Sequence, residues 1–125
     1  MDVVAALIKC DDKVLIARRK TGSEFSYGKW EFPGGKVETH ETEHEAIERE
    51  IKEEFEVTIK ANKFIANVLM EYPSKIINLK LYDCTYLSGE FKLHDHFEYK
   101  FVDMNSLLDY DLCTPDKLLV LKLTK

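Results

Sequence analysis

Three glutamates near the middle of the chain, Glu50, Glu53 and Glu54, have a spacing that lets them act together. On a helix with about 100° per residue they fall at about 0°, 300° and 40°, so all three project from one arc of about 100°. Like charges placed so close repel one another by a few tenths of a kcal/mol per pair. A hard divalent cation, Mg²⁺ or Mn²⁺, prefers such oxygen ligands and would turn the repulsion into attraction. The triplet therefore indicates metal-assisted chemistry, in which Arg49 could orient one carboxylate through paired hydrogen bonds.

Acidic residues are concentrated around this triplet. The chain has a net charge of −5, from 18 basic and 23 acidic residues. Nine glutamates lie within residues 35–57, and the basic residues there are only Lys36, Arg49 and Lys52. The net charge of this window is therefore −6, and the rest of the chain is nearly neutral. A negative chain is a poor partner for a nucleic acid polymer, and we expect no such partner. Bound divalent cations would cancel most of the local excess, so the distribution indicates a metal-bound polyphosphate.

The triplet lies in a segment with the periodicity of a helix. Apolar residues recur at spacings of three and four between residues 42 and 55, as in an amphipathic helix: Ala46, Ile47, Ile51 and Phe55. Thr42 followed by Glu45 fits a capping box at its start.

Strands and loops are expected around this helix. Short apolar or alternating runs predict strands in six segments: 3–9, 13–19, 30–32, 63–72, 76–86 and 97–103. Residues 20–29 predict a loop, residues 105–110 a short helix, and the sequence Thr114-Pro115 the start of a last helix. Runs of strands around two or three helices favour an α/β (α+β) layered domain with a mixed sheet.

The composition is typical of a soluble globular protein. The chain has 125 residues, of which 45% are hydrophobic and 33% charged, so a single domain over residues 1–125 is expected. No apolar run reaches the roughly 18 residues of a membrane helix, and we expect no membrane association. Residues 1–4 lack the basic start of a signal peptide, which favours a cytoplasmic protein. Cys10, Cys84 and Cys113 form no C-x-x-C pair, which favours reduced thiols.

One segment resembles a known motif. Gly35, Glu41 and residues 49–57 follow the pattern G-x5-E-x7-R-E-U-x-E-E-x-G-U, where U is aliphatic, and this pattern is the Nudix box. Six of its seven fixed residues are present. The exception is Glu56, which stands where the box has a glycine that ends the helix in a left-handed conformation. A glutamate there is expected to strain or reshape the helix end and to leave the chemistry upstream unaffected.

The resemblance extends over nearly the whole chain. Arg18-Arg19, residues 30–36, Tyr72-Pro73 and residues 114–116 are similar to their counterparts in the MutT-like branch of the Nudix hydrolase family. This resemblance implies a Nudix-like α/β/α sandwich with a mixed central sheet. It also implies an enzyme that hydrolyses a nucleoside triphosphate, oxidised or cytosine-containing, to the monophosphate and pyrophosphate with Mg²⁺ or Mn²⁺.

The resemblance implies a metal site on the box helix. It assigns the metal to Glu50, Glu53, Glu54 and the carbonyl of Gly34. Glu53 is the first choice for the general base and Glu50 the second, with Arg49 as the third member of the catalytic set. An additional acid would come from Glu98 or Asp95, which lie in the strand and loop where several relatives have one.

The resemblance also implies a nucleotide pocket. Five side chains would bind the substrate: Arg19, Glu31, Lys36, Tyr72 and Asp116. Arg19 and Lys36 are expected at the phosphates, Tyr72 stacked on the base and Asp116 at the base edge. MutT-type readers of 8-oxoguanine have asparagine at the place of Asp116. A carboxylate can accept from cytosine N4, so Asp116 favours a cytosine nucleotide without excluding an oxidised purine.

Structural interpretations of the same residues stay open. An acidic helix face is often only solvated, although the fixed spacing to Arg49 argues against this here. Strand alternation points Arg18 and Arg19 to opposite faces, so at most one of them reaches the site. Asp116 could serve only a helix N-terminus, and Tyr72 could be ordinary strand packing. Four residues without a metal-like pattern are expected at the surface or in loops: His40, His44, His94 and His96.

Two alternative functions remain. The same box could hydrolyse ADP-ribose or a dinucleoside polyphosphate. The second alternative is a non-catalytic Nudix-fold nucleotide-binding module. Such a module should lack one or more of the carboxylates that bind metal, but Glu50, Glu53 and Glu54 are all present. We expect a monomer or a homodimer.

Overall fold

The computed structural model describes residues 1–20, 22 and 26–124. Within that part, seven strands form one mixed sheet in the order β3-β2-β1-β6-β5, with β4 beside β1 and β7 beside β2. The strands are β1 (Asp2–Cys10), β2 (Lys13–Arg19), β3 (Trp30–Glu31), β4 (Gly34–Lys36), β5 (Thr58–Tyr72), β6 (Lys75–Ser88) and β7 (His96–Asp103). The described helices are α1 (Glu43–Phe55), the 3-10 helix η1 (Met104–Asp109) and α2 (Thr114–Leu123). None of them is long and apolar enough to cross a membrane.

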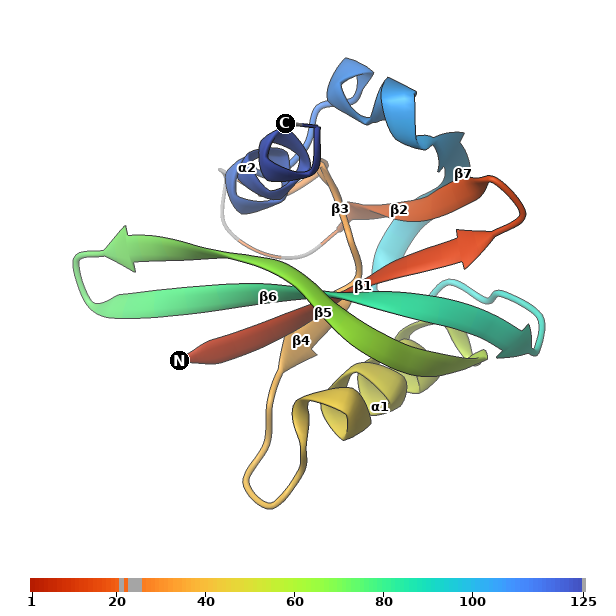
Figure 1. Ribbon diagram of the computed structural model, residues 1–125, viewed down its shortest axis with the longest axis horizontal. Coiled ribbons are helices and arrows are strands. Elements are labelled where there is room, and N and C mark those ends of the chain that lie inside the picture. Colours follow the sequence, from red (N-terminus) through yellow and green to blue (C-terminus); the bar gives the residue numbers. More distant parts are fainter. Residues whose placement is uncertain (21, 23–25, 125) are drawn as a thin grey trace.

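The sheet lies between α1 on one face and α2 with η1 on the other (Figure 1). Alternation along β1 divides the core in two, because Val4, Ala6 and Ile8 pack toward α1 while Ala5 and Leu7 pack on the opposite face. Burial of each large aliphatic side chain contributes about 1.5–3 kcal/mol, so both faces of the sheet need a cover. The expected α/β (α+β) fold with a mixed central sheet is confirmed.

Strand β1 is the centre of the sheet and changes partner along its length. It runs parallel to β6 from Asp2 to Lys9 and pairs with β2 only at Lys9 and Cys10. At its other end, β1 pairs with β4 through Val3–Ala5. Strands β1 and β2 therefore diverge, and residues 31–34 cross the gap between them. Glu31 pairs with Ala17 of β2, and Gly34 pairs with Ala5 of β1.

Strand β4 approaches β1 more closely than a side chain would permit. A Cβ atom on Gly34 would lie 1.9 Å from the carbonyl oxygen of Val4, a distance that no real contact allows. Glycine is therefore required at this position. The sequence did not predict β4, since two glycines in succession look like a turn.

Most expected elements are found, with shifted ends. Helix α1 has the capping box of Thr42 and Glu45 and ends where periodicity placed it. The β5–β6 hairpin is longer than expected and spans residues 58–88 almost without interruption. The short helix expected at residues 105–110 is found as the 3-10 helix η1, Met104–Asp109. Of the loop expected at 20–29, residues 21 and 23–25 lie outside the described residues. The three cysteines are free, as expected.

Candidate active site

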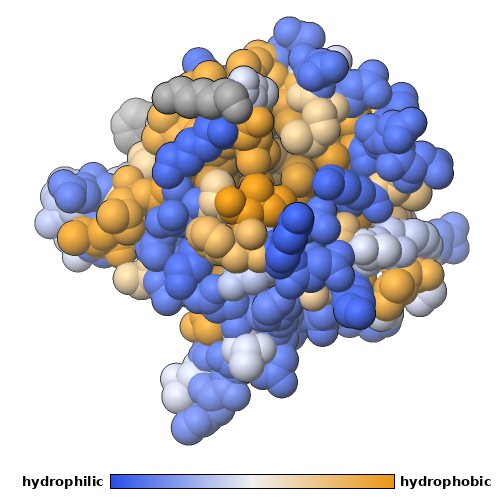
Figure 2. Space-filling view, in the orientation of Figure 1, coloured by the Kyte–Doolittle hydropathy of each residue, from blue (hydrophilic) through white to orange (hydrophobic). Residues whose placement is uncertain are grey.

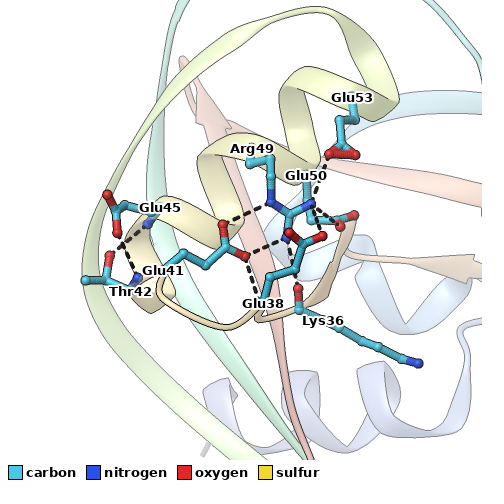
Figure 3. A network of polar contacts seen from close by, with 8 residues as sticks. All are labelled: Lys36, Glu38, Glu41, Thr42, Glu45, Arg49, Glu50 and Glu53. Carbon is cyan, nitrogen blue, oxygen red and sulfur yellow. Dashed lines mark hydrogen bonds and ion pairs between the residues drawn. The ribbon is translucent and has the colours of Figure 1, made fainter.

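Arg49 connects the loop after β4 to the face of α1 that carries the acidic triplet (Figure 3). Its Nε and Nη2 donate to the two carboxylate oxygens of Glu41 at 3.0 and 2.7 Å, and Nη1 donates to Glu50 at 2.9 Å and to Glu53 at 3.0 Å. Nη2 also donates to the carbonyl of Lys36 at 3.1 Å. The bond from Arg49 lowers the pKa of Glu41 to about 2. Arg49 thus holds the loop and two of the three glutamates in fixed positions.

Glu50 packs its carboxyl group against the backbone of Gly35. A Cβ atom at Gly35 would lie 2.4 Å from Cδ of Glu50, so the glycine of the box leaves room for this carboxylate. Burial raises the pKa of Glu50, against the opposing effect of Arg49. The neighbouring Gly34 precedes Gly35 in β4, and both glycines line the cavity described below.

Glu54 is a buried acid with an unsatisfied oxygen. It is 8% exposed, and its Oε1 has no hydrogen-bond partner among the residues that the structure describes. Burial, then the charges of Glu31, Glu50 and Asp95, raises its pKa to about 9. A buried carboxyl without a partner is costly, whereas a cation between these acids would satisfy it. The donor set therefore fits a hard divalent ion.

Glu53 differs from its two neighbours. Its side chain is 58% exposed and accepts from Arg49 at the rim of the site. The structure thus brings Glu50 and Glu54 together in a partly buried place and leaves Glu53 beside them, open to solvent.

A cavity of about 780 Å³ adjoins the acidic site. Five of the residues expected from the sequence line it: Gly34, Arg19, Glu31, Tyr72 and Asp116. Lys36 does not, and lies instead in a second, shallower hollow with Glu38 and Glu50. Tyr72 reaches the cavity from the end of the β5–β6 hairpin, where Figure 2 shows apolar side chains gathered at the left of the view and Leu69 and Ile76 are exposed.

Asp116 lies in the first turn of α2 and is buried at the cavity wall. Its Oδ1 accepts from the backbone N–H of Phe32 at 2.9 Å, which fixes the direction of the carboxyl group. Burial, then the charge of Glu31, raises its pKa well above the ordinary value. Polar atoms of Glu31, Cys113 and Asp116 lie within 4.8 Å of one another, so these three side chains form one wall of the cavity.

Only one of the two consecutive arginines reaches the cavity. Nη1 of Arg19 donates to Oε1 of Glu31 at 2.8 Å. Arg18 pairs instead with Glu98 across the β2–β7 ladder, through Nε at 3.1 Å. Of the two acids left open by the sequence, Asp95 lies near enough to raise the pKa of Glu54, while Glu98 is held by Arg18.

His96 is buried, so the expectation that it lies at the surface or in a loop is wrong. This residue is 3% exposed, and its Nε2 lies 2.9 Å from Oε2 of Glu31. Its ring stacks on Phe55 with centroids 5.2 Å apart. Alternation with Tyr99 and Phe101 would place Phe97 inward, but Phe97 is 41% exposed because the β2–β7 register shifts between Arg18 and Arg19. No local signal in the sequence announces that shift.

Glu56 adopts the left-handed conformation that the box glycine would have, with φ 59° and ψ 31°. Its N–H donates to the carbonyl of Lys52 and closes the helix. Its carboxylate lies 2.5 Å from Nε2 of His94 and 4.0 Å from Nζ of Lys92. The helix end is therefore kept, and two basic side chains from the loop between β6 and β7 lie beside the unusual residue.

Comparison with known proteins agrees with this geometry. The chain matches the NUDIX domain over residues 1–123. It is 33% identical over 116 residues to the CTP pyrophosphohydrolase of Escherichia coli (strain K12), covering 93% of this chain and 85% of that protein. It is 35% identical over 89 residues to the 8-oxo-dGTP diphosphatase of Proteus vulgaris, covering 70% and 79% respectively. The crystal structure of a MutT protein from Methanosarcina mazei Go1 has a TM-score of 0.85 and 29% identity, covering 98% of this chain and 91% of that one. The chain therefore belongs to the Nudix family and is a MutT-like Nudix hydrolase.

Proposed function

We propose that this Nudix hydrolase converts a nucleoside triphosphate to the monophosphate and pyrophosphate with Mg²⁺, or Mn²⁺ in its place. The observation that carries the proposal is the unsatisfied, buried Oε1 of Glu54 beside a cavity of about 780 Å³. An acidic cation site next to a cavity with an arginine and an exposed aromatic ring suits a polyphosphate joined to a base.

The metal would be held by Glu50, Glu53, Glu54 and the carbonyl of Gly34. When bound, the ion would neutralise phosphate oxygens and lower the pKa of a water molecule. The residues of the chain prepare this site, because Arg49 fixes Glu50 and Glu53 and the packing of α1 buries Glu54. Glu53 is the preferred general base, since its exposed carboxylate can accept a proton from water and return it to solvent; Glu50 is the second candidate.

Arg19 and Lys36 approach the site from two hollows and would bind different phosphates. Tyr72 would stack on the base, a contact worth about 1–3 kcal/mol in nucleic-acid complexes. Asp116 and Glu31 would meet the base edge, where Asp116 is already directed by the N–H of Phe32. Cytosine is the preferred base because its N4 amine is a donor, and an oxidised guanine, which also carries an exocyclic amine, is second. The two curated relatives are named for activity on these two bases.

A nucleotide panel tests the proposal. Canonical, oxidised and methylated nucleoside triphosphates, ADP-ribose and dinucleoside polyphosphates are compared by kcat/KM from substrate consumption, and pyrophosphate is identified as the product from the triphosphates. We expect a cytosine triphosphate to rank high and activity to vanish with EDTA. A panel in which ADP-ribose or a dinucleoside polyphosphate ranks first refutes the substrate class.

Glu53→Gln tests the choice of base. This variant should lose about a hundredfold or more in kcat, the usual contribution of a positioned base, while nucleotide binding persists. Glu90→Gln, in an exposed loop, is the matched control and should keep the wild-type rate. Wild-type turnover by Glu53→Gln contradicts the assignment and passes the role to Glu50.

A further inference from the structure

His96 joins two parts of the molecule that the sequence keeps far apart. It begins β7 and lies against α1 through the ring of Phe55, the residue that follows Glu54. Its Nε2 lies 2.9 Å from Oε2 of Glu31, which is in β3 at the cavity wall. No other hydrogen bond is found for its ring among the described residues, since Nδ1 is buried without a partner. Glu31 is thus the polar group that orients this imidazole.

Both oxygens of Glu31 are engaged, each by a different donor. Oε1 accepts from Nη1 of Arg19 at 2.8 Å, and Oε2 faces Nε2 of His96 at 2.9 Å. A carboxylate only accepts, so the proton of the imidazole must be on Nε2. Two donors on opposite oxygens fix the rotation as well as the place of the carboxyl group.

The two donors differ in what else they can reach. Arg19 lines the cavity, is partly exposed and is the expected contact of the phosphates. His96 has a side chain that is 2% exposed and is packed between Phe55 and Glu31, so it has no access to a nucleotide. When Arg19 turns toward a phosphate, His96 is the donor that stays with Glu31.

We propose that His96 is a positioning residue, which holds the carboxylate of Glu31 in its orientation toward the nucleotide while Arg19 binds phosphate. The inference rests on the proposed function, because Glu31 works in the same pocket. It adds a residue that never touches the substrate and that lies outside the Nudix box. Its role is to keep the carboxylate of Glu31 in place at the pocket wall when Arg19, the other donor to Glu31, turns to a phosphate.

A crossed pair of variants separates positioning from packing. His96→Phe keeps a ring against Phe55 and removes the donor, whereas His96→Gln loses the ring and keeps an N–H at a similar reach. We expect His96→Phe to lose about tenfold to a hundredfold in kcat/KM, the range for loss of a hydrogen bond to a charged group. His96→Gln should recover most of this loss although its melting temperature is lower. The opposite order, with His96→Phe the more active variant, overturns the proposal and leaves only a packing role.

A double-mutant cycle with Glu31→Ala shows whether His96 acts through Glu31. His96→Phe should cost little further activity in the Glu31→Ala background, and both single variants should change kcat and KM in the same proportion. Additive losses refute the proposal. The ¹⁵N NMR spectrum of the His96 imidazole gives a readout that does not depend on turnover. A protonated, hydrogen-bonded Nε2 should be seen in the wild type, and its signal should change in Glu31→Ala. An unchanged signal also refutes the proposal. A wild type that releases pyrophosphate from no nucleotide would refute the proposed function instead.

Discussion

Glu54→Gln should stabilise the metal-free protein while it abolishes metal binding at the same position. In the folded chain the pKa of Glu54 is raised to about 9 from 4.5, mainly by burial. A raised carboxyl pKa means that the folded state binds the proton more tightly than the unfolded state. This favourable contribution is complete below about pH 4.5 and is lost progressively as the pH rises to about 9. The metal-free wild type should therefore become less stable over this range.

The magnitude follows from the distance between the two pKa values. Each pH unit between them is worth about 1.4 kcal/mol, so at pH 7 the burial of Glu54 costs about 3 kcal/mol at most. Glutamine has nearly the same shape and no charge to lose, and it avoids most of this cost. For a chain of this size, a gain of about 2 kcal/mol corresponds to a rise in melting temperature of roughly 8 °C.

Thermal unfolding in EDTA and in Mg²⁺, at pH 5, 7 and 8.5, measures the effect. In EDTA the variant should melt above the wild type by an amount that grows with pH. In Mg²⁺ the wild type should gain stability by mass action and the variant much less. Glu90→Gln, at an exposed position, should follow the wild type throughout. A Glu54→Gln variant that melts at or below the wild type in EDTA would refute the cost of the buried acid. A variant that keeps the full gain with Mg²⁺ would refute the role of Glu54 as a metal ligand.

Three further substitutions test other parts of the site. Arg49→Lys cannot reproduce the paired hydrogen bonds to Glu41, so kcat/KM and the affinity for Mg²⁺ should each fall about tenfold, measured by titration of activity with metal. Glu56→Gly should raise the melting temperature, because glycine adopts the observed φ of 59° without strain; a lower value would mean that the pair with His94 outweighs the strain. Asp116→Asn keeps an oxygen for Phe32 N–H, and should lower the ratio of kcat/KM for cytosine over 8-oxoguanine nucleotides by about tenfold; an unchanged ratio contradicts base recognition by Asp116.

The acidic helix is the part of the site that local sequence encodes most completely. Its capping box, apolar stripe and carboxylates all lie within residues 42–56, and each depends only on the 3.6-residue period of a helix. Strand alternation likewise predicts that at most one of Arg18 and Arg19 reaches the cavity, but it does not say which one. The box pattern also includes Gly35, but the sequence did not show why a glycine is needed there. The reason is a contact between Gly35 and Glu50, which joins a strand to a helix.

The pocket wall depends on contacts that no local pattern records. Glu31 lies in a strand of two residues, and its partners Arg19 and His96 come from β2 and β7, up to 65 residues away. The inward position of His96 requires the register shift between β2 and β7, which reverses the alternation expected from Tyr99 and Phe101. The distinction between Asp95 and Glu98 likewise depends on where β7 begins relative to α1.

The sequence by itself determined the family motif, the helix that carries it and the set of acids available to a metal. Those features are local, and their geometry follows from the spacing of residues on one element. Only the tertiary structure decided which acid is buried, which arginine meets Glu31 and that His96 supports it. The physical reason is that burial and pairing are properties of two elements in contact, and the divergence of β1 from β2 determines which elements meet at this site.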